Sequence, residues 1–188
     1  QMLSVVTRIR RMFDLDADPL AIAQTLGVSP LLAPVIERYP GLRLPGGWDG
    51  FEVAVRAVLG QQVSVAAART LASRIVQRYG IAIEPVAGPD LNRLFPGPEQ
   101  LVDADMGQMG ITQARIDTLH GIARALLDGR VDFALEQPLQ TFINRWVLLP
   151  GIGDWTAHYI AMRVLKHPDA FPAADLILRR EANPLGTP

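Results

Sequence analysis

The sequence predicts an all-α fold, and three observations support this prediction. Apolar residues recur at helical spacing in most segments, and Phe51, Val55, Val58 and Leu59 form one such stripe. Capping residues and glycine or proline breaks separate these segments. No segment of any length alternates with the period of a strand, and no internal repeat is present.

The first half of the chain contains five predicted helices. Asp18, Asp49 and Ser64 each suit the N-cap of a helix, because their side-chain oxygens can accept hydrogen bonds from the first turn. Gly27 and Gly80 suit the ends of two of these helices. The predicted helices cover residues 2–13, 16–26, 29–40, 49–59 and 64–79.

The second half begins with a segment rich in proline and glycine, residues 81–98, which is expected to be a loop. Further helices are predicted over residues 98–103, 112–127 and 138–148. Trp146 in the last of these is expected to be a packing residue of the core.

Composition excludes several classes of protein. The 188 residues are enough for one domain or two small lobes, and no run approaches the roughly 20 apolar residues that a membrane span requires. The chain has no cysteine, which excludes disulfides, a thiol nucleophile and cysteine-ligated zinc or iron–sulfur clusters. The three histidines, His120, His158 and His167, show no metal-ligand spacing. We therefore expect a cytoplasmic protein with no membrane partner.

The charge balance limits how this chain could hold nucleic acid. The formal net charge is −1, whereas proteins that bind nucleic acid by bulk electrostatics are usually basic. Lys166 is the sole lysine in the sequence. DNA binding would therefore depend on backbone amides and a few arginines.

The most informative stretch is Leu148–Ala157, in which a Pro-Gly-x-Gly turn joins two helical segments. Gly151 and Gly153 allow a tight turn, and Ile152 between them can point inward. The free N–H groups of the turn and of the next helix would point outward, where they suit an anion such as a phosphate. A plain helix–helix connection remains the alternative interpretation of the turn alone.

The segment LPGIGDWTAHYIAMRVL resembles the helix-hairpin-helix signature of the DNA glycosylase superfamily. That family has an aspartate about twenty residues beyond the hairpin, and Asp175 occupies this place in AFPAADLILRR. A second segment, with FE, VRAVLGQ and VSVA in order, resembles the AlkA-type 3-methyladenine DNA glycosylase II family. The resemblance extends from about Phe13 to Leu178.

The resemblance implies a two-lobed helical fold with a cleft between the lobes. Residues 51–147 would form the central helical bundle, and residues 1–50 would provide N-terminal helices of the second lobe. Residues 148–188 would carry the hairpin, the following helix and the segment with Asp175. The resemblance also implies a catalytic-domain fragment, in which the family's N-terminal β-rich domain and its last helices are missing.

The resemblance assigns roles to four side chains. Asp175 matches the catalytic aspartate, although a lone aspartate before an apolar run is also a good helix N-cap. Trp155 and Tyr159 are four residues apart on one helix face and match the aromatic residues that line the base pocket. Gln62 matches the side chain that wedges into the duplex, where a known member of the family has an aliphatic residue. The alternative is that Gln61 and Gln62 only satisfy backbone groups of their loop.

The hairpin itself would hold the DNA backbone through Gly151, Gly153 and Thr156. In the family, hairpin carbonyls also bind a structural monovalent cation, and by position these would belong to Val147, Leu149 and Gly151. No other cofactor is expected.

The resemblance implies excision of alkylated purines, such as 3-methyladenine, by base flipping and hydrolysis of the N-glycosidic bond. Bifunctional relatives such as endonuclease III have a lysine after the hairpin, where this sequence has Trp155, so we expect a glycosylase without lyase activity. The expected partner is double-stranded DNA with alkylated bases, bound by a monomer at the bacterial nucleoid. Two alternatives are a non-catalytic helix-hairpin-helix DNA-binding module and an interaction domain.

Overall fold

The computed structural model describes residues 2–85 and 91–182, and these fall into two compact units, Gln1–Trp48 and Asp49–Pro188. The described residues are mostly helical, which confirms the predicted fold class. No helix in the described ranges is long and apolar enough to cross a membrane. The second unit contains both the predicted bundle, 51–147, and the described part of the predicted hairpin segment, 148–188. The prediction that residues 1–50 and the C-terminal segment together form the second lobe stays a prediction.

The first unit contains three short helices, α1 (Met2–Met12), α2 (Pro19–Leu26) and α3 (Ala33–Arg38). The carboxylate of Asp18 accepts hydrogen bonds from the N–H groups of Leu20 and Ala21, which confirms the predicted cap of α2. The third helix begins four residues later than predicted, after a turn. None of the three helices contains a buried residue.

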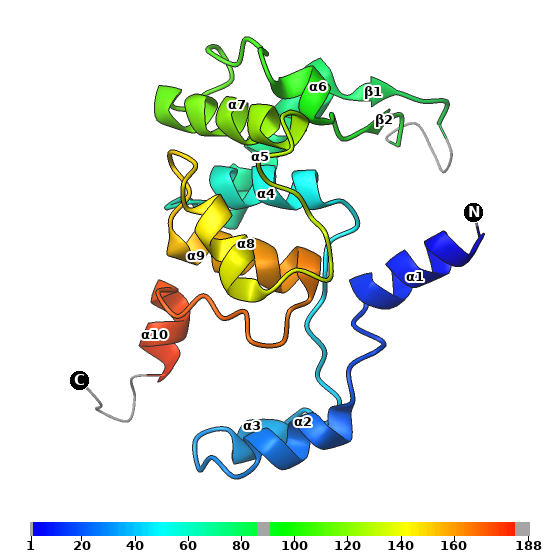
Figure 1. Ribbon diagram of the computed structural model, residues 1–188, viewed down its shortest axis with the longest axis vertical. Helices are drawn as coiled ribbons and strands as arrows, with labels where there is room; N and C mark the ends of the chain where they lie inside the picture. The colour runs from blue at the N-terminus through cyan, green and yellow to red at the C-terminus, as the bar shows by residue number, and fades with distance from the viewer. Residues whose placement is uncertain (1, 86–90, 183–188) are drawn as a thin grey trace. The chain divides into compact units, whose positions relative to one another are not determined.

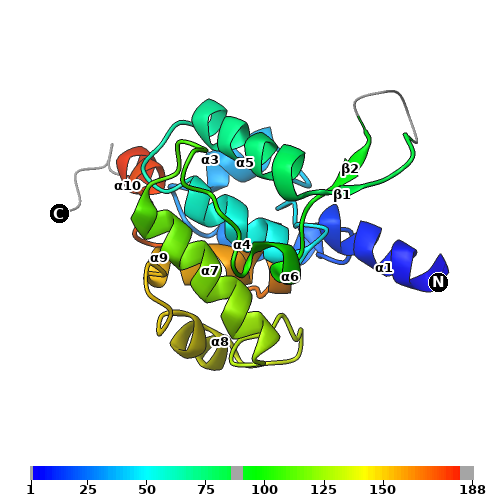
Figure 2. The same cartoon turned by 90° about the horizontal axis from the view of Figure 1, so that it is seen from above.

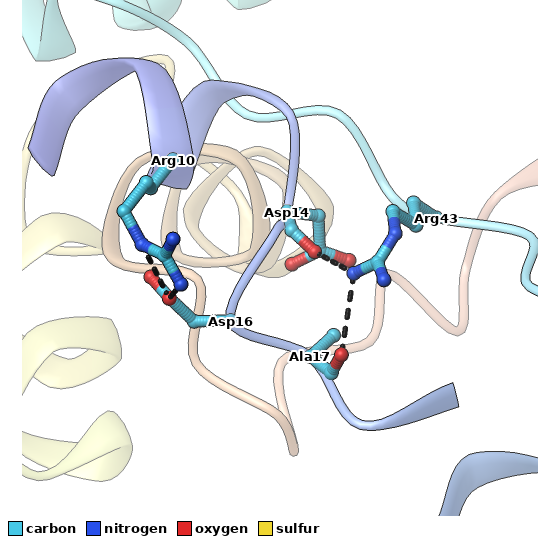
Figure 3. Close-up of polar contacts among 5 residues, drawn as sticks. All are labelled: Arg10, Asp14, Asp16, Ala17 and Arg43. Carbon is cyan, nitrogen blue, oxygen red and sulfur yellow. Dashed lines mark hydrogen bonds and ion pairs between the residues drawn. The ribbon is translucent and has the colours of Figure 1, made fainter. Parts of the chain in front are cut away.

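Polar contacts hold the turn between α1 and α2 (Figure 3). The Arg43 guanidinium donates to the carbonyl oxygens of Asp14 and Ala17, and the contact to Ala17 is 3.2 Å long. Arg10 forms an ion pair with Asp16 across the same turn. Asp14 has a φ of +56°, which marks a tight reversal of the chain. These contacts order a segment that has no apolar core of its own.

Helix α4 (Gly50–Leu59) is the centre of the second unit, where it packs against α5 (Val65–Tyr79), α7 (Gln113–Leu127) and α9 (Asp154–Ile160). Figures 1 and 2 show α4 between these helices. Its predicted apolar stripe is buried, and most of the helix surface is covered. The predicted caps are confirmed, because Asp49 accepts from the N–H of Glu52 at 2.8 Å and Ser64 from that of Ala67 at 3.2 Å.

The segment predicted as a loop over residues 81–98 contains a short hairpin, which corrects that prediction. Strand β1 (Ile81–Ala82) pairs antiparallel with β2 (Arg93–Leu94), and each strand has only two residues. Such a short pairing leaves no alternating pattern in the sequence. Residues 86–90 of this segment lie outside the described residues.

Two further helices, α6 (Pro98–Leu101) and α8 (Leu139–Trp146), complete the bundle with α7. Trp146 is 1% exposed and stacks on Phe142, with the ring centroids 5.2 Å apart. The ring of Phe133 approaches the same indole at 5.3 Å. The prediction that Trp146 is a packing residue is therefore confirmed.

The helix after the hairpin changes its winding near the middle. Helix α9 continues directly into a π-helical segment, Ala161–Leu165, which ends at Lys166 in the left-handed conformation with a φ of +57°. A connecting loop then leads to α10 (Leu176–Ala182). π-helical turns occur often at functional sites, and this one lies between Trp155 and Asp175 in the chain.

Candidate functional site

The hairpin between α8 and α9 sits closely against α7. Gly151 has a φ of +84°, and a Cβ atom placed there would lie 1.9 Å from the Oγ1 of Thr118. Glycine at this position is therefore required twice, by the backbone conformation and by the contact. Ile152 is 4% exposed, which confirms that it points inward. The hairpin is anchored by an apolar side chain on one side and by contact with α7 at Gly151.

The outer edge of the hairpin presents backbone N–H groups. The N–H of Ile152 donates to the carbonyl of Leu149 at 3.0 Å and closes the turn. The N–H groups of Gly151 and Gly153 donate to no other residue in the described part of the chain, and both glycines are exposed. Gly153 is the N-cap of α9. Exposed N–H donors at a turn and a helix start match the arrangement that binds a phosphate oxygen.

Thr156, the third residue predicted to contact the DNA backbone, is 3% exposed. Its hydroxyl oxygen accepts a hydrogen bond of 3.1 Å from the side-chain amide of Gln61. The side chain therefore lies inside the protein, and only its backbone could contact DNA.

The predicted wedge residue, Gln62, lies in the link between α4 and α5. Its side chain is exposed, and its φ is +53°, a conformation that glutamine seldom adopts. The structure therefore leaves this side chain available to contact a duplex. Its neighbour Gln61 does not bond its own loop as the alternative interpretation expected, because its amide donates to the carbonyl of Gly151 in the hairpin at 3.2 Å.

The three carbonyl groups predicted to bind a monovalent cation lie in the hairpin. The carbonyl of Leu149 accepts from Ile152, and that of Gly151 accepts from Gln61. A carbonyl oxygen has two lone pairs, so these two residues and Val147 still fit a weakly bound cation. No cluster of acidic, histidine or cysteine side chains in the described ranges could hold a metal ion. The cation at the hairpin stays a prediction.

The two predicted pocket aromatics form a stack. The rings of Trp155 and Tyr159 have centroids 5.2 Å apart and an interplanar angle of 17°. The guanidinium of Arg163 lies over the Tyr159 ring, 5.5 Å from its centroid. Trp155 and Arg163 both contact the Tyr159 ring and cover part of it. The indole of Trp155 is therefore a better surface than the Tyr159 ring for stacking a base.

The carboxylate of Asp175 lies directly beside this stack. Its Oδ2 accepts a 2.9 Å hydrogen bond from the indole Nε1 of Trp155. Its Oδ1 accepts from the N–H groups of Ile177 and Leu178, at 2.9 Å and 3.1 Å, and so caps the start of α10. The two interpretations of Asp175 are therefore compatible, because one oxygen caps the helix and the other faces the aromatic stack.

These contacts keep Asp175 ionised. The N–H of Leu178 and then the Trp155 indole lower the pKa of the carboxyl, and partial burial opposes them only in part. A lowered pKa makes the carboxylate a weak proton acceptor near neutral pH. The side chain is thus better suited to act through its fixed negative charge than to remove a proton.

A second contact ties the Asp175 loop to α9. The N–H of Phe171 donates to the Nδ1 of His158 at 3.3 Å. We infer from this contact that the ring proton is on Nε2, which lies 3.6 Å from the Oδ1 of Asp154. Two residues of α9 therefore hold the loop: Trp155, near the N-terminal end of the helix, bonds Asp175, and His158, one turn later, bonds Phe171.

Sequence reasoning missed two residues that organise the site. The side chain of Arg115 on α7 donates to the backbone carbonyl of Gln61, and Gln61 in turn bonds the hairpin. The contacts of Gln61 span 90 and 95 residues of sequence, so no local pattern reveals them. The one available signal was the pair of adjacent glutamines in a short break between two helices.

Two family models match the chain. The model described as "HhH-GPD superfamily base excision DNA repair protein" matches residues 55–187, and the model of the AlkA N-terminal domain matches residues 1–49. The second match covers the first unit, so this chain contains a segment of the family's N-terminal region, and the expectation that the β-rich domain is missing stays a prediction. The described residues of that unit are helical rather than β-rich.

Curated proteins of two bacteria are similar to this chain. It is 43% identical over 187 residues to a probable bifunctional transcriptional activator/DNA repair enzyme AlkA of Mycobacterium tuberculosis, with 100% of the chain and 38% of the relative covered. It is 34% identical over 178 residues to DNA-3-methyladenine glycosylase 2 of Escherichia coli, with 93% and 60% covered. The chain thus spans less than two thirds of either relative.

A solved structure with DNA has a similar fold. The 3-methyladenine DNA glycosylase of Schizosaccharomyces pombe, in complex with abasic DNA, superposes with a TM-score of 0.65 at 26% identity. The superposition covers 81% of this chain and 73% of that one.

Proposed function

The chain belongs to the HhH-GPD superfamily of base excision DNA repair proteins, and from this premise we propose that it excises alkylated purines from double-stranded DNA. The proposed reaction is hydrolysis of the N-glycosidic bond, which leaves an abasic site. The names of its relatives in Escherichia coli and Schizosaccharomyces pombe support a 3-methyladenine glycosylase, and the name of its relative in Mycobacterium tuberculosis supports a role in DNA repair. With DNA as its substrate, the protein would act at the bacterial nucleoid.

One observation carries the proposal: the Oδ2 of Asp175 accepts a hydrogen bond of 2.9 Å from the indole Nε1 of Trp155. This contact brings a fixed negative charge beside an aromatic surface on which a base could stack. In a non-catalytic DNA-binding module, the residues behind the hairpin would have no need for such a pair. The proximity of an anion and a stacking surface matches the needs of N-glycosidic bond cleavage.

The first step would take the lesion nucleotide out of the duplex, at a cost of a few kcal/mol. The exposed N–H groups of Gly151 and Gly153 would hold a phosphate of the lesion strand. Gln62 would occupy the vacated space between the neighbouring bases. The flipped base would then stack on Trp155, which favours a cationic alkylated purine through the electron-rich face of the indole.

Bond cleavage would develop positive charge on the deoxyribose as the base departs. The ionised carboxylate of Asp175 would stabilise this charge, and it could orient the attacking water. Its lowered pKa suits this electrostatic role, because the group stays ionised without taking a proton. An alkylated, cationic purine is already a good leaving group, so a strong general acid is not required.

We further propose that the enzyme has no lyase activity. Strand cleavage through a Schiff base needs an amine nucleophile at the sugar, and Lys166 is the sole lysine of the chain. Lys166 follows Trp155 by eleven residues along a helical path. At a rise of about 1.5 Å per residue, its Cα lies roughly 16 Å further along that path.

The test uses duplex oligonucleotides with one hypoxanthine or one 3-methyladenine. We expect base release by the chain, with strand breaks only after alkali treatment. Treatment with borohydride during the reaction should trap no covalent protein–DNA product, whereas a lyase would be trapped.

The outcomes separate the candidate functions. Binding without release of either base would support a non-catalytic DNA-binding module and overturn the enzymatic proposal. Strand breaks before alkali, or a trapped covalent product, would leave the glycosylase proposal intact and overturn the absence of lyase activity.

A further inference from the structure

We propose that Gln61 is a positioning residue that fixes the wedge residue, Gln62, relative to the DNA-binding hairpin. This inference rests on the proposed function, because it assigns a role in base flipping. It adds a residue that touches neither the base nor the sugar in the proposed complex. Three contacts of Gln61 carry it.

The side-chain amide of Gln61 reaches two acceptors of the hairpin region. Its Nε2 donates to the carbonyl of Gly151 at 3.2 Å and to the hydroxyl of Thr156 at 3.1 Å. A primary amide has two N–H groups, so each acceptor can receive its own hydrogen bond. Gly151 is in the turn and Thr156 in the first turn of α9, so one side chain bonds both parts of the hairpin motif.

The backbone of Gln61 is fixed from a second side. Arg115 on α7 donates to the carbonyl oxygen of Gln61, and both residues are half-buried. The same helix carries Thr118, which contacts Gly151 closely enough to exclude a Cβ atom there. Helix α7 therefore supports both the wedge link and the hairpin, and Gln61 joins them directly.

Gln62 follows this fixed residue and has an unusual backbone conformation. Its φ is +53°, and its side chain is exposed. A non-glycine residue persists in this conformation where its surroundings determine it. The contacts of Gln61 hold the backbone next to Gln62 in place, so the position of the Gln62 side chain depends on them.

The expected consequence is selective for duplex DNA. A wedge is needed where a base must leave a stack, whereas a lesion in a single strand needs little unstacking. Gln61→Leu removes both side-chain hydrogen bonds at nearly constant volume, and we expect it to slow excision from duplex DNA about tenfold. Excision from the single-stranded oligonucleotide of the same sequence should fall much less. Gln140→Leu is the matched control, because Gln140 is exposed on α8, away from these contacts.

A double-mutant cycle tests whether Gln61 acts through Gln62. If it does, Gln61→Leu should have little further effect on duplex excision in the presence of Gln62→Ala. Fully additive effects, or an equal loss on duplex and single-stranded DNA, would overturn the proposal. If Gln61→Leu lowers the melting temperature too far for use, Thr156→Val removes one acceptor and should show a smaller loss with the same preference for duplex DNA.

A fluorescence measurement separates this inference from the proposed function. The probe is a duplex with a stable abasic-site analogue and 2-aminopurine as its neighbour, whose fluorescence rises when the stack opens. At saturating protein, Gln61→Leu should give a smaller rise than the wild-type chain. If the wild-type chain releases no base but this difference appears, the enzymatic proposal fails and the positioning role stands. An equal rise in both proteins would overturn the positioning role.

Discussion

The substitution Asp175→Asn tests the chemistry while keeping most of the local structure. Asparagine is as good an N-cap as aspartate, so its side-chain oxygen can still accept from the first turn of α10. Its amide nitrogen would then face the indole N–H of Trp155, a donor opposite a donor. The variant therefore loses the negative charge and the hydrogen bond to Trp155 but keeps the helix cap.

The two consequences differ in size. A hydrogen bond to a charged group contributes about 1.5–3 kcal/mol, and solvent screens this half-buried carboxylate, so losing the bond to Trp155 should cost about 1–2 kcal/mol of stability. For a chain of this length such a loss lowers the melting temperature by about 2–8 °C. Removing one preorganised electrostatic group from a transition state costs about 100- to 1,000-fold in rate. Activity should therefore fall far more than the folded fraction does.

The assay is single-turnover release of hypoxanthine from a duplex, together with thermal unfolding followed by circular dichroism. Asp169→Asn is the matched control, because Asp169 is an exposed aspartate of the same connecting loop and should leave both measurements unchanged. An Asp175→Asn protein that excises within about tenfold of the wild-type rate would refute the role of the fixed charge. It would leave Asp175 as a helix cap alone.

Two further predictions concern the aromatic stack and the hairpin. In Trp155→Phe, Asp175 loses the indole donor but keeps the backbone donors of α10, so the pKa of its carboxyl should rise toward the ordinary value near 4. In the proposed mechanism the ionised form of Asp175 is the active one, so the acid limb of excision should move to higher pH. Carboxyl-carbon NMR titration of the free protein measures the same change, and an unshifted pKa would contradict the hydrogen bond. Gly151→Ala places a Cβ atom 1.9 Å from Thr118 Oγ1 at a φ of +84°, and it should destabilise the protein by about 2–4 kcal/mol in urea unfolding. Gly153→Ala is its control, since a Cβ atom there meets nothing within 4 Å, and equal losses in both variants would rule out the contact with α7.

Local rules predicted much of the second unit. Asp49 and Ser64 cap the helices that follow them, and the apolar stripe of α4 is buried, because these features depend on neighbours within one or two turns. Ile152 also points inward as expected from the turn. The family resemblance supplied Asp175 and Trp155 as a pair, and the structure places them in contact.

The features that sequence reasoning missed depend on distant contacts or on small departures from regular geometry. The bonds of Gln61 join segments that are far apart in the chain, and the contact of Gly151 with Thr118 needs the packed tertiary structure. The strands of two residues are too short to leave a periodic signal. The burial of Thr156 was missed because its place after the hairpin suggested only contact with DNA.

The π-helical segment at Ala161–Leu165 makes the chain sensitive to changes of length rather than of composition. A π turn holds one residue more than an α turn, so the segment acts as a single-residue insertion. Deleting any one of these residues would restore α-helical winding and rotate everything downstream by about 100°. The anchors at Phe171 and Asp175 would then face another direction, even though neither had been altered. A homologue with a one-residue gap in this segment would therefore need other contacts to position the aspartate that corresponds to Asp175.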